Sequence, residues 1–419
     1  MIETDLKNLK IRLYALVIFR DILETGPVKK LLELLAELDT SEAVISRFPE
    51  LAVISSADSY GALCRAIYAE GGDLSRFVLD YILNRDDFFV SNYTGGQSAD
   101  ASVSYAVADC LEEEMTTLQQ LADLRSEDIT SLMDCGMVLP RWENSTCDVR
   151  AEYLELLSGL STSGYGMFRN TAMFKVRGGK LIAVRNAEYQ TLSQLYGYEQ
   201  ERSLVLRNTE ALADGKRASN VLLYGDAGTG KSSTVKACAA HFFDKGVRLV
   251  EFDKNQVSEI PEIAESLSSN PLKFIFFIDD LTFEDNDSDF YALKGILEGN
   301  ISGTGSNILI YATSNRRHLV KESAAQRQGD DLHLNDTLQE IMSLSARFGL
   351  TVTFLKPEKD LYLDIMENLA REQGLLTEET TEEELDDLRR RAEAYAIRSN
   401  GRSPRTAKQF VTLANTGLR

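Results

Sequence analysis

The stretch that decides the fold is Gly225-Asp226-Ala227-Gly228-Thr229-Gly230-Lys231-Ser232, which satisfies the phosphate-loop pattern GxxxxGK[S/T] in full. An apolar run at 221–224 precedes it and a helical pattern at 233–243 follows it. This is the strand, loop and helix context that the pattern requires. The glycines let the backbone curl until its N–H groups point at phosphate oxygens at a helix N-terminus. We therefore predict a site for nucleotide phosphates here.

Two side chains of this loop have separate predicted roles. Lys231 is expected to reach the β- and γ-phosphates of ATP, and Ser232 to coordinate Mg²⁺. The alternative is a glycine-rich turn that binds no ligand, and the flanking strand and helix argue against it. The predicted nucleotide-binding residues are Gly225, Asp226, Ala227, Gly228, Thr229, Gly230, Lys231, Ser232 and Ser233.

A second apolar run, 274–278, ends in Asp279 and Asp280. Carboxylates directly after such a strand are typical of a Walker B segment, whose first acid holds the Mg²⁺ shell. We assign that role to Asp279 and expect Asp280 to orient the attacking water. Glu284 is an alternative for the second role if the strand end bends suitably. The structural alternative is a pair of carboxylates that only cap the following helix.

A polar amide, Asn315, follows the apolar run 308–312. In the usual sheet order this strand lies beside the one that ends in Asp279. The Asn315 side chain would then align water against the γ-phosphate, as a sensor residue. The alternative is an asparagine that ends a strand with a turn. The two motifs that precede it favour the sensor role.

Two arginines complete the predicted set. Arg347 closes a predicted helix just before the last core strand, and we expect it to project into the site of a neighbouring subunit. Such a cation stabilises charge that develops on the transferred phosphoryl group. An ordinary surface ion pair is its alternative role. Arg405 opens the last predicted helix after Pro404 and is expected to couple lid position to the γ-phosphate, with Arg402 as the alternative.

The wider pattern predicts an α/β core between helical regions. From residue 220, short apolar runs alternate with helix-length segments, as in a parallel sheet buried on both faces. We expect five strands, at 221–224, 248–252, 274–278, 308–312 and 351–354. The predicted regions are a mostly helical N-terminal domain at 1–160 that selects a target, a linker with short strands at 161–191, the core at 192–356 and a small helical lid at 357–419.

The composition restricts partners and location. The formal net charge of -20 disfavours direct binding to nucleic acid, whose phosphates the chain would repel on average. The five cysteines have no paired metal-ligand spacing, and with three histidines a zinc site is not expected. The N-terminus is acidic and the first apolar run is too short to span a bilayer. We expect a cytoplasmic protein with no membrane partner.

The order of these motifs resembles the AAA+ superfamily of P-loop ATPases. The strings at 220–225, 230–236, 277–284 and 311–318 are similar to the bacterial family catalogued as domain of unknown function 815, from about Leu192 to Phe410. The resemblance implies an ATP- and Mg²⁺-binding core that assembles into homo-oligomers. It also implies that Leu195–Tyr198 lines the adenine pocket. AAA+ proteins commonly carry a glutamate where this chain has Asp280, and the shorter side chain implies either slow hydrolysis or a water that is bridged differently.

Three functional hypotheses follow. The first is an ATPase that assembles through its AAA+ modules and acts on an unknown macromolecular client. The second is an ATP-loaded switch or scaffold that hydrolyses slowly. The third is a loader of nucleic-acid machinery, and the acidic charge counts against direct contact with DNA.

Overall fold

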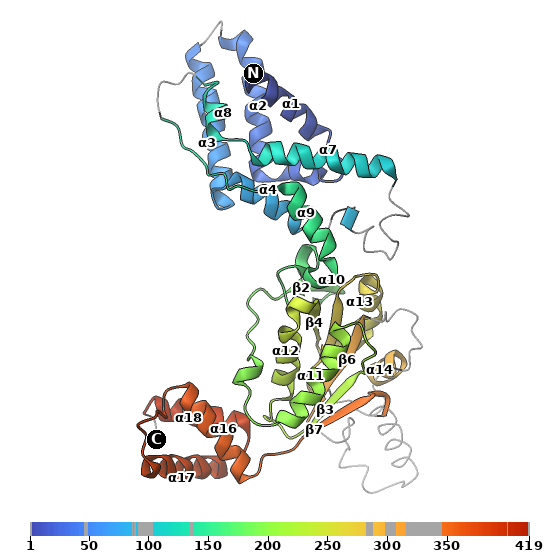
Figure 1. The fold of residues 1–419 in the computed structure, drawn as a ribbon, viewed down its shortest axis with the longest axis vertical. Helices are drawn as coiled ribbons and strands as arrows, with labels where there is room; N and C mark the ends of the chain where they lie inside the picture. Colours follow the sequence, from blue (N-terminus) through green and yellow to red (C-terminus); the bar gives the residue numbers. More distant parts are fainter. Residues whose placement is uncertain are drawn as a thin grey trace. The chain divides into compact units, whose positions relative to one another are not determined.

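The computed structural model describes residues 2–45, 49–85, 87, 89–90, 104–133, 138–281, 288–297, 307–315, 346–399 and 401–417. The chain divides into two compact units, residues 1–169 and 170–419. Figure 1 shows helices throughout the first unit and a sheet with surrounding helices in the second. The two units are described separately below.

Unit 1 is built from helices around its own apolar core. The helices with more than eight residues are α1 (Ile2–Tyr14), α2 (Gly26–Ile45), α3 (Pro49–Ala69), α4 (Leu74–Leu83), α7 (Tyr105–Ala122) and α9 (Val149–Ser158). A buried carboxylate, Glu114, fixes the turn after α1 by accepting hydrogen bonds from the backbone N–H groups of Val17, Ile18 and Phe19. The bond to Phe19 satisfies a buried donor, and all three bonds satisfy the buried carboxylate.

Unit 2 contains a sheet in the order β2-β1-β4-β5-β6-β3-β7. The strands are β1 (Met173–Arg177), β2 (Lys180–Ala183), β3 (Val221–Gly225), β4 (Val247–Phe252), β5 (Lys273–Ile278), β6 (Ile308–Ser314) and β7 (Leu350–Phe354). All neighbouring pairs are parallel except β1 with β2. The five predicted strands are therefore confirmed, with β3 at the point where the order of connection reverses. Ligands of open α/β sheets bind at such a point.

The expected number of strands was wrong, because the described sheet has seven rather than five. The segments at 172–176 and 181–184, predicted to be short strands of a linker, form β1 and β2 and belong to the same sheet as the core strands. β1 pairs with β4 from Met173 to Lys175, and a two-residue turn at Gly178 and Gly179 leads back into β2. Both glycines have positive φ, as a tight hairpin turn of this length requires.

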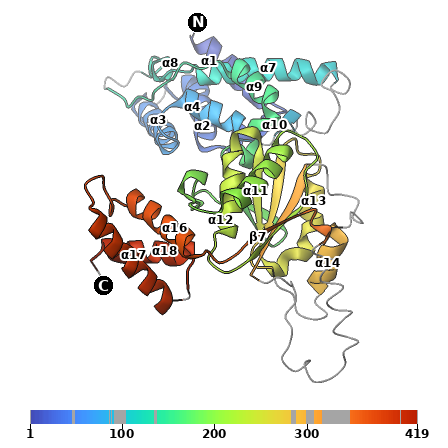
Figure 2. The ribbon, with the colours of Figure 1, turned by 60° about the horizontal axis from the view of Figure 1, so that its bottom comes forward.

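The helices of the core cover both faces of the sheet. Figures 1 and 2 show α11 (Glu199–Ala213) and α12 (Lys231–His241) together on one face, and α13 (Ile260–Leu267) and α14 (Ser288–Leu297) on the other. Tyr311 of β6 is fully buried under α11, where its hydroxyl contacts Thr209 at 2.9 Å. Because helices cover both faces of the sheet, the strands bury side chains on both faces and are continuous apolar runs in the sequence.

The lid of unit 2 follows β7 and consists of α16 (Lys359–Glu372), α17 (Glu382–Arg398) and α18 (Pro404–Asn415). Its buried residues, such as Tyr362 and Phe410, belong to the same apolar cluster as the core residues Val221 and Phe354. The small helical lid after the α/β core is thus confirmed. Within the part of the chain that the structure describes, no helix combines the length and the apolar character needed to cross a bilayer.

Candidate nucleotide site

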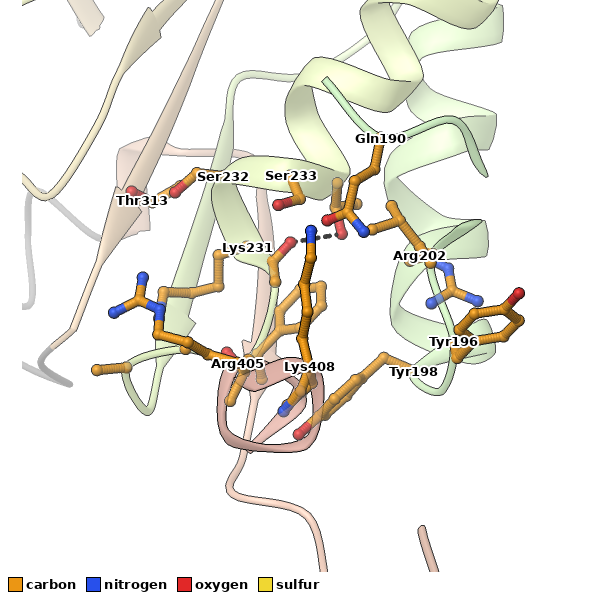
Figure 3. A pocket seen from close by; sticks show the side chains of 18 of the residues that line it. Gln190, Tyr196, Tyr198, Arg202, Lys231, Ser232, Ser233, Thr313, Arg405 and Lys408 are labelled. Atoms are coloured by element: carbon orange, nitrogen blue, oxygen red, sulfur yellow. Dashed lines mark hydrogen bonds between the residues drawn. The ribbon is translucent and has the colours of Figure 1, made fainter. Parts of the chain in front are cut away.

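The site lies at the carboxyl edge of the sheet, where β3, β5 and β6 end. A cavity of about 470 Å³ opens there between the core and the lid, within the usual size range of ligand pockets. Lys231, Ser232 and Ser233 line it from the start of α12, and Arg405 and Lys408 enter from the lid (Figure 3). The cavity is therefore enclosed by segments that lie far apart in the sequence.

The phosphate loop owes its conformation to glycines. Gly225 has a φ of +135°, and a side chain there would collide with the carbonyl oxygen of Phe354 at the end of β7. Gly228 and Gly230 also have positive φ, which lets the loop wrap around an open centre before α12 begins. Gly225 and Asp226 form the base of the loop, and the other seven predicted residues, from Ala227 to Ser233, line the cavity.

Lys231 is held at the centre of the loop. Its Nζ donates hydrogen bonds to the carbonyl oxygens of Gly225 at 3.0 Å and Asp226 at 2.8 Å, and to Asn315 Oδ1 at 2.9 Å. The side chain is buried, and this desolvation lowers its pKa. A buried ammonium that lines the cavity can bind phosphate when it exchanges these oxygen partners for phosphate oxygens.

The predicted metal ligands lie side by side. Ser232 Oγ donates a hydrogen bond of 2.6 Å to Asp279 Oδ1, and Thr313 Oγ1 donates one of 2.6 Å to the same oxygen. Mg²⁺ prefers hard oxygen ligands and keeps several waters, so a site with one carboxylate and one hydroxyl is sufficient beside substrate phosphates. Ser232 and Asp279 therefore fit the metal predicted for them.

Asp280 has an unusual backbone for a residue with a side chain. Its φ is +52°, in the left-handed region that aspartate tolerates better than most residues. Its N–H donates to Thr313 Oγ1 at 2.9 Å, and its Oδ1 accepts from Asn315 Nδ2 at 2.7 Å. Asn315 thus links Lys231 to Asp280 through its hydrogen bonds. The two residues predicted to act on the attacking water, Asp280 and Asn315, therefore lie side by side.

The two candidate lid arginines have different surroundings. Arg402 forms an ion pair with Glu393, with Nε and Oε1 2.7 Å apart. Arg405 lines the cavity, and its backbone N–H donates to the carbonyl oxygen of Gly228 at 3.2 Å. This geometry favours Arg405 over Arg402 for a lid contact with nucleotide, and the role of Arg405 stays a prediction.

Arg347 lies away from this cavity. It precedes β7, whose first residue, Leu350, pairs with Val221 at the start of β3. Because parallel strands run in the same direction, Arg347 is at the edge of the sheet opposite the phosphate loop. A strand of five residues spans roughly 17 Å, so Arg347 cannot serve the site of its own chain. Glu284, the alternative to Asp280, lies outside the described residues.

Several residues that line the cavity were not predicted from the sequence. Thr313 is not among the predicted site residues, although it contacts both Asp279 and Asp280. Lys408, Arg202 and Gln190 also line the cavity. The sequence held a signal for Lys408: it follows Arg405 by three residues, which places the two cations on one face of a helix.

An aromatic wall closes the cavity opposite the phosphate loop. Tyr196 and Tyr198 line it, as the resemblance implied for this segment. The ring of Tyr198 lies 5.3 Å from that of Phe354, centre to centre, and its hydroxyl donates to the carbonyl oxygen of Leu355 at 2.6 Å. The wall is thereby fixed to the segment that connects core and lid, and it presents a flat face of the kind on which a base can stack.

The charge of the cavity differs in sign from that of the chain. Of the described residues that line it, four are basic, Arg202, Lys231, Arg405 and Lys408, and two are acidic, Asp279 and Asp280. The whole chain carries a formal charge of -20. Positive charge is thus concentrated where an anion is predicted to bind.

Comparisons with known proteins add a family match. The family model described as "Protein of unknown function (DUF815)" matches residues 168–417. This span contains the whole of Leu192–Phe410 and confirms the resemblance found from the motifs. No curated protein matches the chain.

Solved structures of RuvB from Thermotoga maritima are also similar. A RuvB mutant has a TM-score of 0.36 and 16% identity over 54% of this chain and 64% of that chain. The RuvB Holliday junction branch migration motor has a TM-score of 0.32 and 15% identity over 54% and 71% of the two chains. This chain thus spans less than two thirds of the first of these. The fold assignment rests on the strand order and the motifs.

Proposed function

The chain belongs to the family of proteins of unknown function DUF815, and on this premise we propose that it is an ATPase that couples binding and hydrolysis of ATP with Mg²⁺ to conformational change on a macromolecular client. The observation that carries the proposal is the set of hydrogen bonds by which Asn315 joins Lys231 to Asp280. A structural turn would not need a buried lysine, a sensor amide and a carboxylate to meet at the open end of a phosphate loop.

Each residue of this set has a role in the proposed reaction. Lys231 and the backbone N–H groups of the loop bind and orient the terminal phosphates. Asp280 orients the attacking water, and Asn315 keeps both side chains in position. Bound Mg²⁺, held by Ser232 and Asp279, would neutralise charge on the phosphate oxygens. Catalysis of this kind depends on positioning and electrostatics.

The lid and a second subunit complete the proposed mechanism. Arg405 enters the cavity from α18, so the position of the lid would change with the phosphate that Arg405 meets. Arg347 lies at the opposite edge of the sheet and would act in the site of a neighbouring copy, so hydrolysis would depend on homo-oligomer assembly. Unit 1 is the proposed target-recognition part. It carries twice as many acidic as basic side chains, which favours a protein client over nucleic acid.

The test is ATP affinity and turnover of the full chain beside Lys231→Ala. Loss of a charge-assisted partner from a partly desolvated cradle should weaken ATP binding by roughly 2–4 kcal/mol. The matched control is Lys236→Ala, because Lys236 lies on the same helix and forms an ion pair with Glu251 at 3.0 Å. Its ATP affinity should be unchanged. Equal affinities of the wild type and Lys231→Ala would contradict the assignment.

One observation favours a second candidate, an ATP-dependent switch that hydrolyses slowly. The short Asp280 side chain is bonded to Asn315 and stands on a left-handed backbone, which limits how far its carboxylate reaches. Single-turnover hydrolysis, measured alone and with a captured partner, separates the candidates. A switch would retain ATP for minutes until its partner binds, whereas a motor would turn over steadily.

A further inference from the structure

We infer that Lys408 is a second phosphate-binding cation of the lid, which holds the α-phosphate of a bound nucleotide and thereby lets the lid close on a diphosphate as well as on a triphosphate. The inference rests on the proposed function, since it assigns a residue to the same site. It assigns different contacts to the two lid cations. Lys408 contacts any bound nucleotide, and Arg405 contacts only a nucleotide that has a γ-phosphate.

The start of α18 fixes which way these two cations face. Ser403 caps the helix by accepting the N–H of Thr406 at 3.1 Å, and Pro404 occupies the first turn. Ala407 and Phe410 are buried in the apolar cluster of unit 2. Arg405 and Lys408, three residues apart, are exposed on the other face and line the cavity.

The first turn of α18 is also held against the phosphate loop. The backbone N–H of Arg405 donates to Gly228, and a side chain on Gly228 would come within 3.1 Å of Arg405 Cβ. The approach therefore needs a residue without a side chain at 228. Lys408 lies about one turn, roughly 5 Å, further along the helix. The two cations thus enter the cavity at different points along its length.

A nucleotide would lie along this length in a fixed direction. Lys231, Asn315 and Asp280 mark the end where the γ-phosphate is expected, and the wall that contains Tyr198 marks the end for the base. Arg405 belongs to the first end: burial lowers the pKa of Lys231, and Arg405 adds to that effect by charge repulsion. Ser233 follows Ser232 on α12 and also lines the cavity.

Lys408 lies between these ends. Figure 3 shows its side chain entering the cavity from the lid between Tyr198 and Ser233, while Arg405 extends toward the side of Lys231 and Thr313. The phosphate nearest the base is the α-phosphate, and Lys408 is the lid cation placed beside it. A flexible ammonium is suited to such a contact because it bonds phosphate as a point charge.

Charge balance supports a second lid cation. Among the residues that the structure describes, the lining carries four basic and two acidic side chains, and the complex of Mg²⁺ with a nucleoside triphosphate is a dianion. The chain as a whole is acidic and repels anions. Each cation in the cavity therefore also speeds the approach of an anionic ligand.

The experiment measures affinities for ATP and ADP, each with Mg²⁺, in the full chain and four variants. Lys408→Gln should weaken both nucleotides by the same factor, about tenfold, the scale of one charge-assisted hydrogen bond. Lys408→Arg should restore most of the affinity for both. Arg405→Gln should weaken ATP at least fivefold more than ADP. Arg398→Gln removes an exposed positive charge from α17 and should change neither affinity.

Failure of the Lys408 contact and failure of the proposed function give different results. If Lys408→Gln leaves ADP affinity unchanged, or weakens ATP alone, the α-phosphate contact is wrong. If Arg398→Gln weakens binding as much as Lys408→Gln, the effect is one of overall lid charge and the inference is also wrong. Thermal unfolding without nucleotide should be the same for Lys408→Gln and the wild type, because the side chain is exposed. If the wild type binds neither nucleotide, the proposed function itself fails.

Discussion

Thr313 holds Asp279 from the neighbouring strand, with 2.6 Å between Thr313 Oγ1 and Asp279 Oδ1. The same hydroxyl accepts the backbone N–H of Asp280 at 2.9 Å. A buried hydroxyl therefore orients both acids, one through its side chain and one through its backbone. The end of β6 supplies this support, and Asn315, the predicted sensor residue, follows directly after it.

Thr313→Val should lower Mg²⁺-dependent turnover about tenfold or more, because it removes one hydrogen bond to Asp279 and leaves the Asp280 N–H without its partner. ATP affinity without metal should change little, since Lys231 is untouched. The measurement is turnover as a function of Mg²⁺ concentration. Thr313→Ser keeps the hydroxyl and should retain most activity; if it is as impaired as Thr313→Val, the effect comes from packing of the methyl group.

Asp280→Asn should bind ATP as the wild type does and hydrolyse it at least a hundredfold more slowly. The amide preserves the size of the side chain and tolerates the positive φ of this position, but it no longer orients water as a base. Nucleotide retention on the purified variant, followed by chromatography of bound ATP and ADP, tests this. Hydrolysis at the wild-type rate would contradict this role of Asp280 and make Glu284 the candidate for it.

The prediction from sequence succeeded where local pattern determines structure. The phosphate loop and the strands that end in Asp279 and Asn315 are short segments whose residue types and spacing carry the information. The sequence predicted β1 and β2 as short strands but not as part of the core sheet, because their place in the sheet depends on pairing between Met173 and Leu249, which are far apart in the chain. No local pattern reports such a partner.

The same limit explains what was missed at the site. The part played by Thr313 depends on the register of β5 and β6, where Ile278 lies beside Ala312. The position of Lys408 depends on how the lid packs on the core. The left-handed backbone of Asp280 occurs together with its bonds to Thr313 and Asn315. Each of these contacts joins residues that are close only after folding.

Gly225→Ala should destabilise unit 2 by at least about 3 kcal/mol, since the added methyl collides with the carbonyl oxygen of Phe354 and the φ of +135° suits only glycine. The control is Gly215→Ala at the end of α11, where φ is +68° but no atom lies within 4 Å of the new methyl. That variant should lose only about 1–2 kcal/mol. Denaturant unfolding measures both. Equal losses would mean that the clash is relieved by movement of β7.

Arg347→Ala should bind ATP almost normally and hydrolyse it far more slowly, by roughly 10³–10⁵ if it acts as a finger arginine in a neighbouring site. The position at the edge of the sheet opposite the phosphate loop is the reason: a residue that cannot reach its own site and still accelerates hydrolysis must act on another subunit. The control is Arg217→Ala, because Arg217 is exposed just before β3 at the same edge. Its turnover should be close to that of the wild type.

Mixing of variants decides whether Arg347 acts in trans. Arg347→Ala subunits have an intact phosphate loop, and Lys231→Ala subunits have an intact arginine, so a mixed assembly contains sites with one working part from each. Turnover should rise from near zero to a sizeable fraction of the wild-type rate, and it should depend on protein concentration because assembly does. Co-purification of two differently tagged variants proves that they assemble. No recovery in a proven mixed assembly, or a wild type that is active as a strict monomer, would leave Arg347 with a structural role only.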